Sequence, residues 1–281
     1  MRFSLSCARP SEASPGGLGR KPVTSKMLLL AGEGVLPVLV RQKARETFEV
    51  VTVSCRFFRL HRDLNPEHLL ENLSFEELLS VLRAEKPEVL CLAGKVPKAY
   101  VFAPEVSSLF APCRSLQDRD ILRECIRLLE DEGFKVLSPF PFLKDWVTEE
   151  GILFGPPPTE EEWRDVEYGF RIARFLADEE IGQTVVVKRR TVVALEGAEG
   201  TDETIRRGLA LVPCGVVVKV ARSNQDFLID IPAIGAETIR LLGEGGGRLI
   251  ALESGKTLLL DREEVGILAE RFGVTVLGVA W

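Results

Sequence analysis

Acidic residues gather in two short stretches in the second half of the chain. In the stretch EGAEGTD, Glu196, Glu199 and Asp202 fall within seven residues, directly after an apolar run expected to form a strand. Carboxylates grouped at a strand end suit Mg²⁺, which prefers oxygen ligands and keeps several waters. A helix is expected to begin here, and Thr201 or Asp202 can cap it. The stretch therefore predicts either a helix cap or a metal site.

The second stretch is QDFLIDIPAIG, residues 225–235, in which Asp230 stands between two isoleucines and Pro232 follows. An aspartate inside an apolar run is costly unless it is paired or used. We therefore favour a catalytic or metal-binding role for Asp230 over capping of a helix expected from about Ala233. Lys219 ends the upstream run GVVVK and can face the same cleft.

Two glycine-containing turns in the first half of the chain follow apolar runs, in AGEGVLP and LAGKV. In an open parallel sheet, ligands bind beyond the carboxyl ends of the strands. Gly32, Gly34 and Lys95 are therefore candidates for contacts with an anionic ligand such as phosphate. A purely structural turn is the alternative for the two glycines, and a solvated surface side chain is the alternative for Lys95.

The first turn also raises the possibility of a nicotinamide-dependent oxidoreductase. The dinucleotide fingerprint G-x-G-x-x-G needs a third glycine, and Pro37 occupies that position. The fingerprint also needs an acid at the end of the next strand, which here ends in Ser54 and Cys55. Two sequence features that the nicotinamide hypothesis requires are therefore absent from this motif.

Composition limits the chemistry further. The only histidines are His61 and His68, both in a polar segment, which argues against a Ser-His or Cys-His triad and against a zinc site. The net charge of −6 argues against a nucleic-acid partner. The six cysteines form no C-x-x-C motif, which indicates a reducing compartment. No apolar run approaches the roughly 20 residues that span a bilayer, so any membrane contact is expected to be peripheral.

The elements that position these residues follow from the alternation of apolar runs and amphipathic segments. Strand and helix patterns alternate over residues 27–147, which predicts a Rossmann-like domain with a parallel sheet. The segment 148–160 contains three consecutive prolines and predicts a linker. Residues 161–281 predict a second, mixed α/β domain. Residues 1–26 are rich in Ser, Pro, Gly and Arg, which predicts a disordered tail or an upstream start.

Local signals fix several helices. Ser74 with Glu77 predicts the start of one helix, and Thr159 with Glu162 predicts a capping box for a helix over about 160–178. Apolar residues at helical spacing after residue 118 predict another, closed by Gly133. The run TVVVKRRTVVALE predicts a hairpin in the second domain.

Eight short stretches of the chain occur in the same order in one enzyme family. The chain resembles the LpxI-type UDP-2,3-diacylglucosamine pyrophosphatases of lipid A biosynthesis over about residues 27–280. EGTD together with QD…D-x-P-x-IG is the most specific part of the resemblance. The matching stretches are AGEGVLP, LAGKV, RDILR, EIGQ, VVALEGAEGTD, GVVVKVARSNQD, DIPAIG and SGKTLLLDRE. Glu33 stands where the family often has a glycine, and Ile231 where leucine is usual.

The resemblance implies a Mg²⁺- or Mn²⁺-dependent hydrolysis of UDP-2,3-diacylglucosamine to UMP and 2,3-diacylglucosamine 1-phosphate, with water attacking the β-phosphorus. It implies substrate bound between two α/β domains, a homodimer, and a cytoplasmic enzyme peripheral to the inner face of the inner membrane. The family's key aspartate falls on Asp230. The expected metal ligands are Asp230, Glu196, Glu199 and Asp202, and the expected substrate and phosphate contacts are Gly32, Gly34, Lys95, Thr201, Lys219 and Gln225. A module that binds a UDP-lipid without turnover is the alternative outside enzymes.

Overall fold

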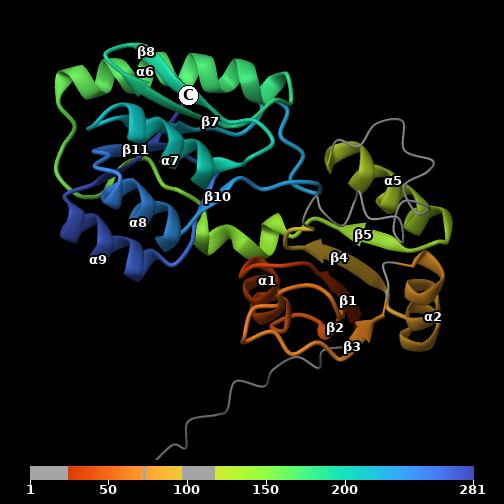
Figure 1. Cartoon of the computed structure of the whole chain (residues 1–281). Coiled ribbons are helices and arrows are strands. Elements are labelled where there is room, and N and C mark those ends of the chain that lie inside the picture. The colour runs from red at the N-terminus through yellow and green to blue at the C-terminus, as the bar shows by residue number, and fades with distance from the viewer. Residues whose placement is uncertain (1–24, 72–73, 97–117) are drawn as a thin grey trace, which may run out of the picture.

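The first domain is built on a parallel sheet. The computed structural model describes residues 25–71, 74–96 and 118–281, so nearly all of the predicted N-terminal tail lies outside the described residues. Five parallel strands follow the order β3-β2-β1-β4-β5 (Figure 1). They are β1 (Lys26–Ala31), β2 (Glu49–Cys55), β3 (His68–Leu70), β4 (Val89–Ala93) and β5 (Lys135–Leu137). The strand order starts at β1 in the centre and continues to β2 and β3 on one side and to β4 and β5 on the other. This order confirms the predicted Rossmann-like arrangement.

The helices of this domain are α1 (Leu36–Ala44), α2 (Phe75–Glu85) and α5 (Asp118–Asp131), followed by the 3-10 helix η1 (Phe140–Trp146). Ser74 caps α2 as predicted, because its side chain accepts a hydrogen bond from the Glu77 amide. Strand β3 comes from the polar segment around His68, where the sequence predicts no strand. It is a short edge strand of three residues, and so needs little apolar patterning.

The second domain has a mixed six-stranded sheet in the order β6-β13-β11-β9-β7-β8. Strands β9, β11 and β13 are parallel to one another, β6 and β7 run antiparallel to them, and β8 is antiparallel to β7. The strands are β6 (Gly151–Phe154), β7 (Thr184–Lys188), β8 (Thr191–Leu195), β9 (Val216–Lys219), β11 (Leu249–Glu253) and β13 (Thr275–Val279). The predicted mixed α/β domain is thus confirmed, including the β7–β8 hairpin.

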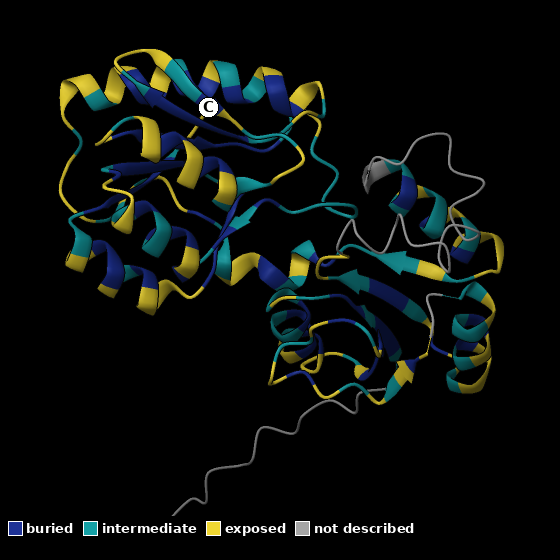
Figure 2. Cartoon of the chain, in the orientation of Figure 1, coloured by how far each residue is buried: buried dark blue, intermediate teal, exposed yellow. Residues whose placement is uncertain are grey.

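Helices cover both faces of this sheet. Helix α6 (Glu160–Asp178) packs on one face, and the capping box of Thr159 and Glu162 starts it as predicted. Helices α7 (Thr201–Leu211), α8 (Ala236–Glu244) and α9 (Arg262–Phe272) cover the other face. Each helix turns its buried side to the sheet and its exposed side to solvent (Figure 2).

Two sequence predictions need correction. The sequence predicts a linker over 148–160, but residues 151–154 form β6, which pairs antiparallel with β13. The apolar residues of this stretch extend the sheet edge, whereas the prolines follow only afterwards. The sequence also allows Asp230 to cap a helix from about Ala233. Ala233 instead begins the short strand β10 (Ala233–Ile234), and α8 starts later with Gly235 as its N-cap.

Strand β10 belongs to a feature that joins the two domains. It pairs parallel with β12 (Leu258–Leu259) in a separate two-stranded sheet. Leu258 and Leu260 are buried in the same apolar cluster as Met27 and Leu29 of β1, and Ala233 packs against that cluster. The last quarter of the chain therefore completes the hydrophobic core of the first domain.

The two glycine turns of the first domain lie directly against each other. The Gly32 amide donates to the Ala93 carbonyl (2.8 Å), and the Glu33 amide donates to the Lys95 carbonyl (2.8 Å). A Cβ on Gly32 would lie 2.7 Å from the Lys95 carbonyl oxygen. A Cβ on Gly94 would lie 2.8 Å from the Gly32 carbonyl carbon and from Pro37 Cγ. These glycines are thus needed for the approach of two backbone segments.

We predict that Gly94→Ala destabilises the protein more than Gly34→Ala. Both glycines have positive φ, +97° and +93°, so both substitutions carry a left-handed backbone penalty of about 1–2 kcal/mol. Only the Gly94 substitution adds steric overlap, worth about 1–3 kcal/mol more, because a Cβ on Gly34 meets nothing within 4 Å. Urea unfolding of both variants measures the difference, and equal losses of stability would contradict this account of the two turns.

Candidate active site

Polar side chains meet at one edge of the second sheet, where its parallel strands end. Lys219 is the last residue of β9, and Glu253 is the last residue of β11. Thr184 begins the antiparallel strand β7 directly opposite Lys219, and Glu196 follows β8. The strand order thus gathers four polar residues at the edge where open α/β sheets bind their ligands.

Lys219, Thr201 and Glu196 form a connected, largely buried group. The Lys219 ammonium, 5% exposed, donates to Thr201 Oγ1 (2.7 Å), and the Thr201 hydroxyl donates to Glu196 Oε1 (3.1 Å). Burial by itself raises the pKa of Glu196. The Lys219 charge and hydrogen bonds from Thr184, the Gln183 amide and Thr201 outweigh that effect and hold the pKa below its usual value. The group therefore presents a paired anion and cation at neutral pH.

Gln183 connects this group to Asp230. Its backbone amide donates to Glu196 Oε2 (3.1 Å), and its side-chain amide donates to Asp230 Oδ2 (3.2 Å). The Arg222 guanidinium lies 3.8 Å from the same Asp230 oxygen. Gln225 holds the segment from the other side, because its side chain donates to the Asp230 carbonyl (2.7 Å) and accepts from the Arg222 amide (3.0 Å).

Asp230 is the most accessible acid of the network. Its side chain is 46% exposed, whereas Arg222 beside it is 20% exposed. Both contacts of its carboxylate use Oδ2. Within the described part of the chain, Oδ1 has no hydrogen-bond partner and is available for a water, a metal ion or a substrate. Asp230 thus combines a fixed position with a free acceptor.

Glu253 fixes the start of the segment that carries Arg222 and Asp230. Its carboxylate is almost fully buried and lies 2.6 Å from Arg174 of α6 and 2.9 Å from Lys256. It also accepts a hydrogen bond from the Ala221 amide (2.9 Å). Removing either cation would weaken the compensation of this buried acid, which is strongly destabilising.

The structure does not bring all four predicted metal ligands together. Glu199 pairs with Arg207 (2.7 Å), and Asp202 accepts from Thr238 of α8 (2.9 Å). Across residues 25–71, 74–96 and 118–281, no three His, Cys, Asp or Glu side chains form a group able to hold a metal. Neither predicted cap of α7 is present either, since Gly200 is its N-cap and makes no side-chain cap hydrogen bond. Gln183 joins Glu196 to Asp230.

The candidates from the first domain lie in the paired glycine turns. Because the amides of Gly32 and Glu33 bind carbonyls of the second turn, they are not free to bind a phosphate. Gly34 and the Lys95 side chain are exposed and keep that possibility. Val35 and Ala93 in these turns pack against the same apolar cluster as Ile231, so the turns lie near the Asp230 segment.

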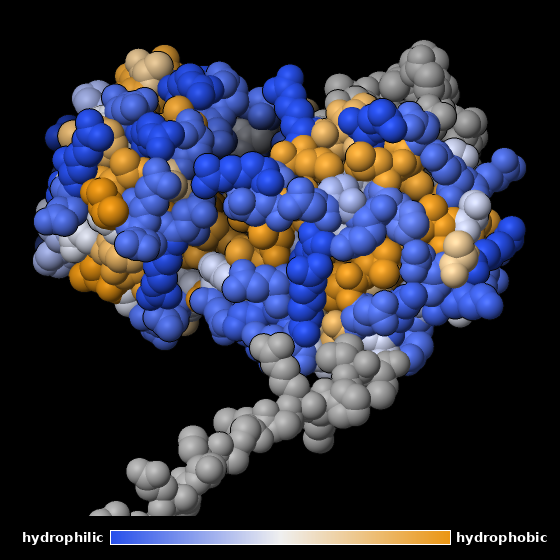
Figure 3. Space-filling model, turned by 90° about the horizontal axis from the view of Figure 1, so that it is seen from below, coloured by the Kyte–Doolittle hydropathy of each residue, from blue (hydrophilic) through white to orange (hydrophobic). Residues whose placement is uncertain are grey.

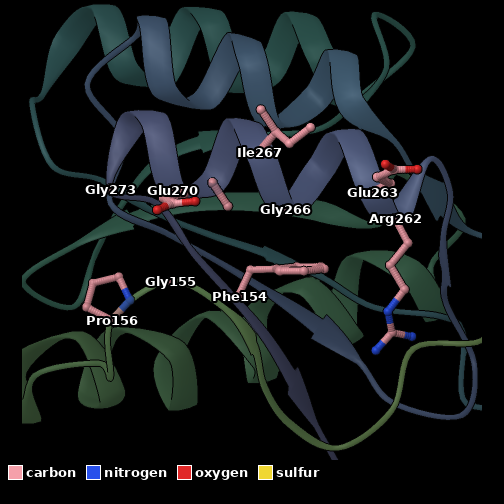
Figure 4. A pocket seen from close by; sticks show the side chains of 10 residues that line it. Phe154, Gly155, Pro156, Arg262, Glu263, Gly266, Ile267, Glu270 and Gly273 are labelled. Atoms are coloured by element: carbon pink, nitrogen blue, oxygen red, sulfur yellow. The ribbon is translucent and has the colours of Figure 1, made fainter.

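A separate surface pocket of about 810 Å³ lies between α9 and the segment after β6. Phe154, Pro156 and Ile267 supply much of its wall, and Arg262, Glu263 and Glu270 lie at its borders (Figure 4). None of the residues of the Asp230 network lines it. The pocket has no group of paired ionisable side chains comparable to that network, so we place the candidate active site at Asp230.

Comparison with known proteins identifies the family. A model of the LpxI N-terminal domain matches residues 26–146, and a model of the LpxI C-terminal domain matches residues 149–277. The chain belongs to the LpxI family. The LpxI domains meet between η1 and β6, and the motif D-I-P-A-I-G with Asp230 lies in the C-terminal one.

A named relative supports the family assignment. UDP-2,3-diacylglucosamine pyrophosphatase LpxI of Caulobacter vibrioides is 30% identical over 278 residues, which cover 90% of this chain and 97% of the relative. Two solved structures also align with this chain. One is a GalE-like L-threonine dehydrogenase from Cupriavidus necator, whose alignment covers 91% of this chain and 86% of the dehydrogenase chain. The other is the CobK precorrin-6A reductase, whose alignment covers 92% of this chain and 88% of the reductase chain. Their sequence identities to this chain are 10% and 14%, and the TM-scores are 0.32 and 0.27.

Four residues of the candidate site were not predicted from the sequence: Gln183, Thr184, Arg222 and Glu253. Gln183 and Arg222 lie in stretches that resemble the family, EIGQ and GVVVKVARSNQD, but nothing in those stretches shows which acid they contact. Glu253 ends an apolar strand, as Glu196 nearly does, and that position was the available signal.

We predict that Glu196 makes the stability of the protein depend on pH. Because its pKa is lowered in the folded state, Glu196 contributes stability above its unfolded pKa of about 4.3, and this contribution is lost as the pH falls through the lowered value. The difference in unfolding free energy between wild type and Glu196→Gln should therefore shrink below about pH 4.3. Urea unfolding between pH 3 and 7 measures it, and a difference that does not change with pH would contradict the prediction.

Proposed function

We propose that this chain hydrolyses the pyrophosphate bond of UDP-2,3-diacylglucosamine and releases UMP and 2,3-diacylglucosamine 1-phosphate. The observation that carries the proposal is the match to both LpxI domains, together with a segment carrying Asp230 that contacts the second domain through Gln183 and the first domain through Phe227. The activity named for the Caulobacter vibrioides relative supports the same reaction.

Asp230 is suited to act on the attacking water. Its Oδ2 is held by Gln183 and lies near Arg222, so the carboxylate has a fixed orientation, and Oδ1 is free to accept a proton. In the proposed step the water oxygen bonds to the β-phosphorus and the bond from that phosphorus to the bridging oxygen breaks. UMP leaves with the bridging oxygen, and Asp230 takes the proton of the water.

Lys219 and Arg222 are suited to neutralise the pyrophosphate. Lys219 is a buried cation, and its bond to Thr201 places it beside the first residue of α7, where helix N–H groups favour anions. Fixed charges at a partly desolvated edge stabilise charge that develops on a phosphate more strongly than they would in water. Gly34 and Lys95 remain candidate contacts from the first domain.

We propose that Mg²⁺ takes part through a small donor set. Glu199 and Asp202 are paired elsewhere, and Glu196 is engaged by Thr201 and Gln183. In this arrangement Asp230 would bind the ion through Oδ1 in place of accepting the proton of the water. Phosphate oxygens of the substrate and several waters would complete the usual magnesium site, which has one or two carboxylates. When bound, the ion would neutralise phosphate charge and polarise the reacting group.

The substrate is a membrane lipid, so we further propose a cytoplasmic enzyme that binds peripherally to the inner face of the inner membrane. Seen from below, apolar side chains reach the surface in the middle of the molecule, where the two domains adjoin (Figure 3). Such a surface suits acyl chains. Within the described residues, none of the helices combines the length and hydropathy needed to cross a bilayer. The expected homodimer also remains a proposal, which sedimentation analysis can test.

We predict that Asp230→Asn lowers the rate of UMP release by at least about 100-fold, because the substitution removes the proton acceptor. The folded state should survive, since Asp230 is half exposed. Product release from UDP-2,3-diacylglucosamine, followed by mass spectrometry, measures the loss. Glu203→Gln is the matched control, because Glu203 is an exposed acid of α7 outside the network, and it should keep full activity. Full activity of Asp230→Asn would remove Asp230 from the mechanism.

The same assay tests the metal and the point of attack. EDTA should abolish UMP release and Mg²⁺ should restore it, and Glu199→Gln and Asp202→Asn should lose much less activity than Asp230→Asn.

In ¹⁸O-water, attack at the β-phosphorus places the label in 2,3-diacylglucosamine 1-phosphate, whereas label in UMP would contradict it. Tight binding of the substrate with no product over hours would favour the binding module instead. Tight binding of NADH or NADPH would favour the oxidoreductase.

A further inference from the structure

The segment 221–232 leaves the second sheet after β9, carries Asp230, and returns to β10. Its base is held by the second domain. The Ala221 amide binds Glu253 (2.9 Å), and both the amide and the hydroxyl of Ser223 bind Asp178 (2.7 Å each). Two carboxylates thus fix the point at which the segment departs from the sheet.

The tip of the segment is held by the first domain. The Phe227 ring stacks on the Phe140 ring of η1, with a centroid separation of 4.1 Å and an interplanar angle of 13°. The Ser138 hydroxyl donates to the Phe227 carbonyl (2.8 Å) and accepts from the Phe140 amide (3.2 Å). The segment therefore spans the boundary between the two domains, with side-chain and backbone contacts at its tip.

A compact turn links Phe227 to Asp230. The Asp230 and Ile229 amides both donate to the Asp226 carbonyl (3.1 and 3.0 Å), and the Leu228 amide donates to Asp226 Oδ1 (3.1 Å). Because these bonds close the turn, a displacement of Phe227 is passed on to Asp230. Gln183 and Gln225 hold Asp230 from the second domain, so its position depends on both domains at once.

We propose that Phe227 is a positioning residue, whose stacking on Phe140 sets the place of the Asp230 carboxylate when the two domains are docked. This inference rests on the proposed function, because it assigns Phe227 a part in the same site. Phe227 acts through the turn, and Asp230 makes the contact with the reacting water. The aromatic pair is suited to this task because two flat rings restrict each other's tilt as well as their distance.

The test compares Phe227→Ala with Phe227→Tyr and Phe140→Ala in the full-length protein. Loss of the stack should lower kcat by about 100-fold, as expected for a displacement of about 1 Å at a reacting group, while KM changes much less. Phe227→Tyr keeps a ring and should keep most of the activity. The double variant Phe140→Ala/Phe227→Ala should lose no more activity than either single variant, because both substitutions remove the same contact. Phe175→Ala, which removes a 63% exposed phenylalanine of α6, is the control and should match wild type.

Two results would overturn the proposal. A raised KM with unchanged kcat in Phe227→Ala would mean that the ring binds substrate, and additive losses in the double variant would mean that the rings act separately. Amide hydrogen exchange over residues 226–231 gives a readout without substrate. Exchange should be faster in Phe227→Ala and unchanged in Phe175→Ala. If the wild type releases no UMP, the proposed function fails, and unchanged exchange in Phe227→Ala would separately overturn the positioning role.

Discussion

The placement of Asp230 between two domains is the constraint on which the site depends. The segment that carries it is hydrogen-bonded to Glu253 and Asp178 at its base and packed on the first domain at Phe227 and Ile231. Neither domain alone supplies both sets of contacts. The parallel strands of the second sheet position Lys219, and the contacts of the segment with both domains position Asp230.

Buried charge at this edge is tolerated because every ion has partners. Lys219 and Glu196 stabilise each other through Thr201, and Glu253 is matched by Arg174 and Lys256. Removing one member would leave the other charged and desolvated, which is more costly than losing the pair. The network is thus a fixed electrostatic environment, and such preorganisation is what a reaction that redistributes phosphate charge requires.

Much of the fold could be predicted from the sequence, because strand and helix periodicity and the two capping signals are local. Strands β3, β6 and β10 were missed, since β3 is polar, β6 precedes a run of prolines and β10 has only two residues. For the site, Asp230 stood out as a lone acid in an apolar run, and Glu196 and Lys219 stood out at strand ends. Gln183 and Arg222 could not be assigned, because their roles depend on β7 lying beside β9, a pairing that periodicity does not reveal. Glu199 and Asp202 lie in the same acidic stretch as Glu196, but their side chains contact Arg207 and Thr238 and do not join the network.

Because of the small β10–β12 sheet, the structural boundary between the domains does not follow the order of the sequence. The two family models divide the chain near residue 148, yet Leu258 and Leu260 fill the core that β1 and β4 begin. A fragment that ends at residue 146 would carry an open apolar face in place of those side chains, and that face would favour aggregation. The halves are therefore not exchangeable modules. A chimera that joins the N-terminal half of one family member to the C-terminal half of another has to keep matched core residues at both ends of the sequence.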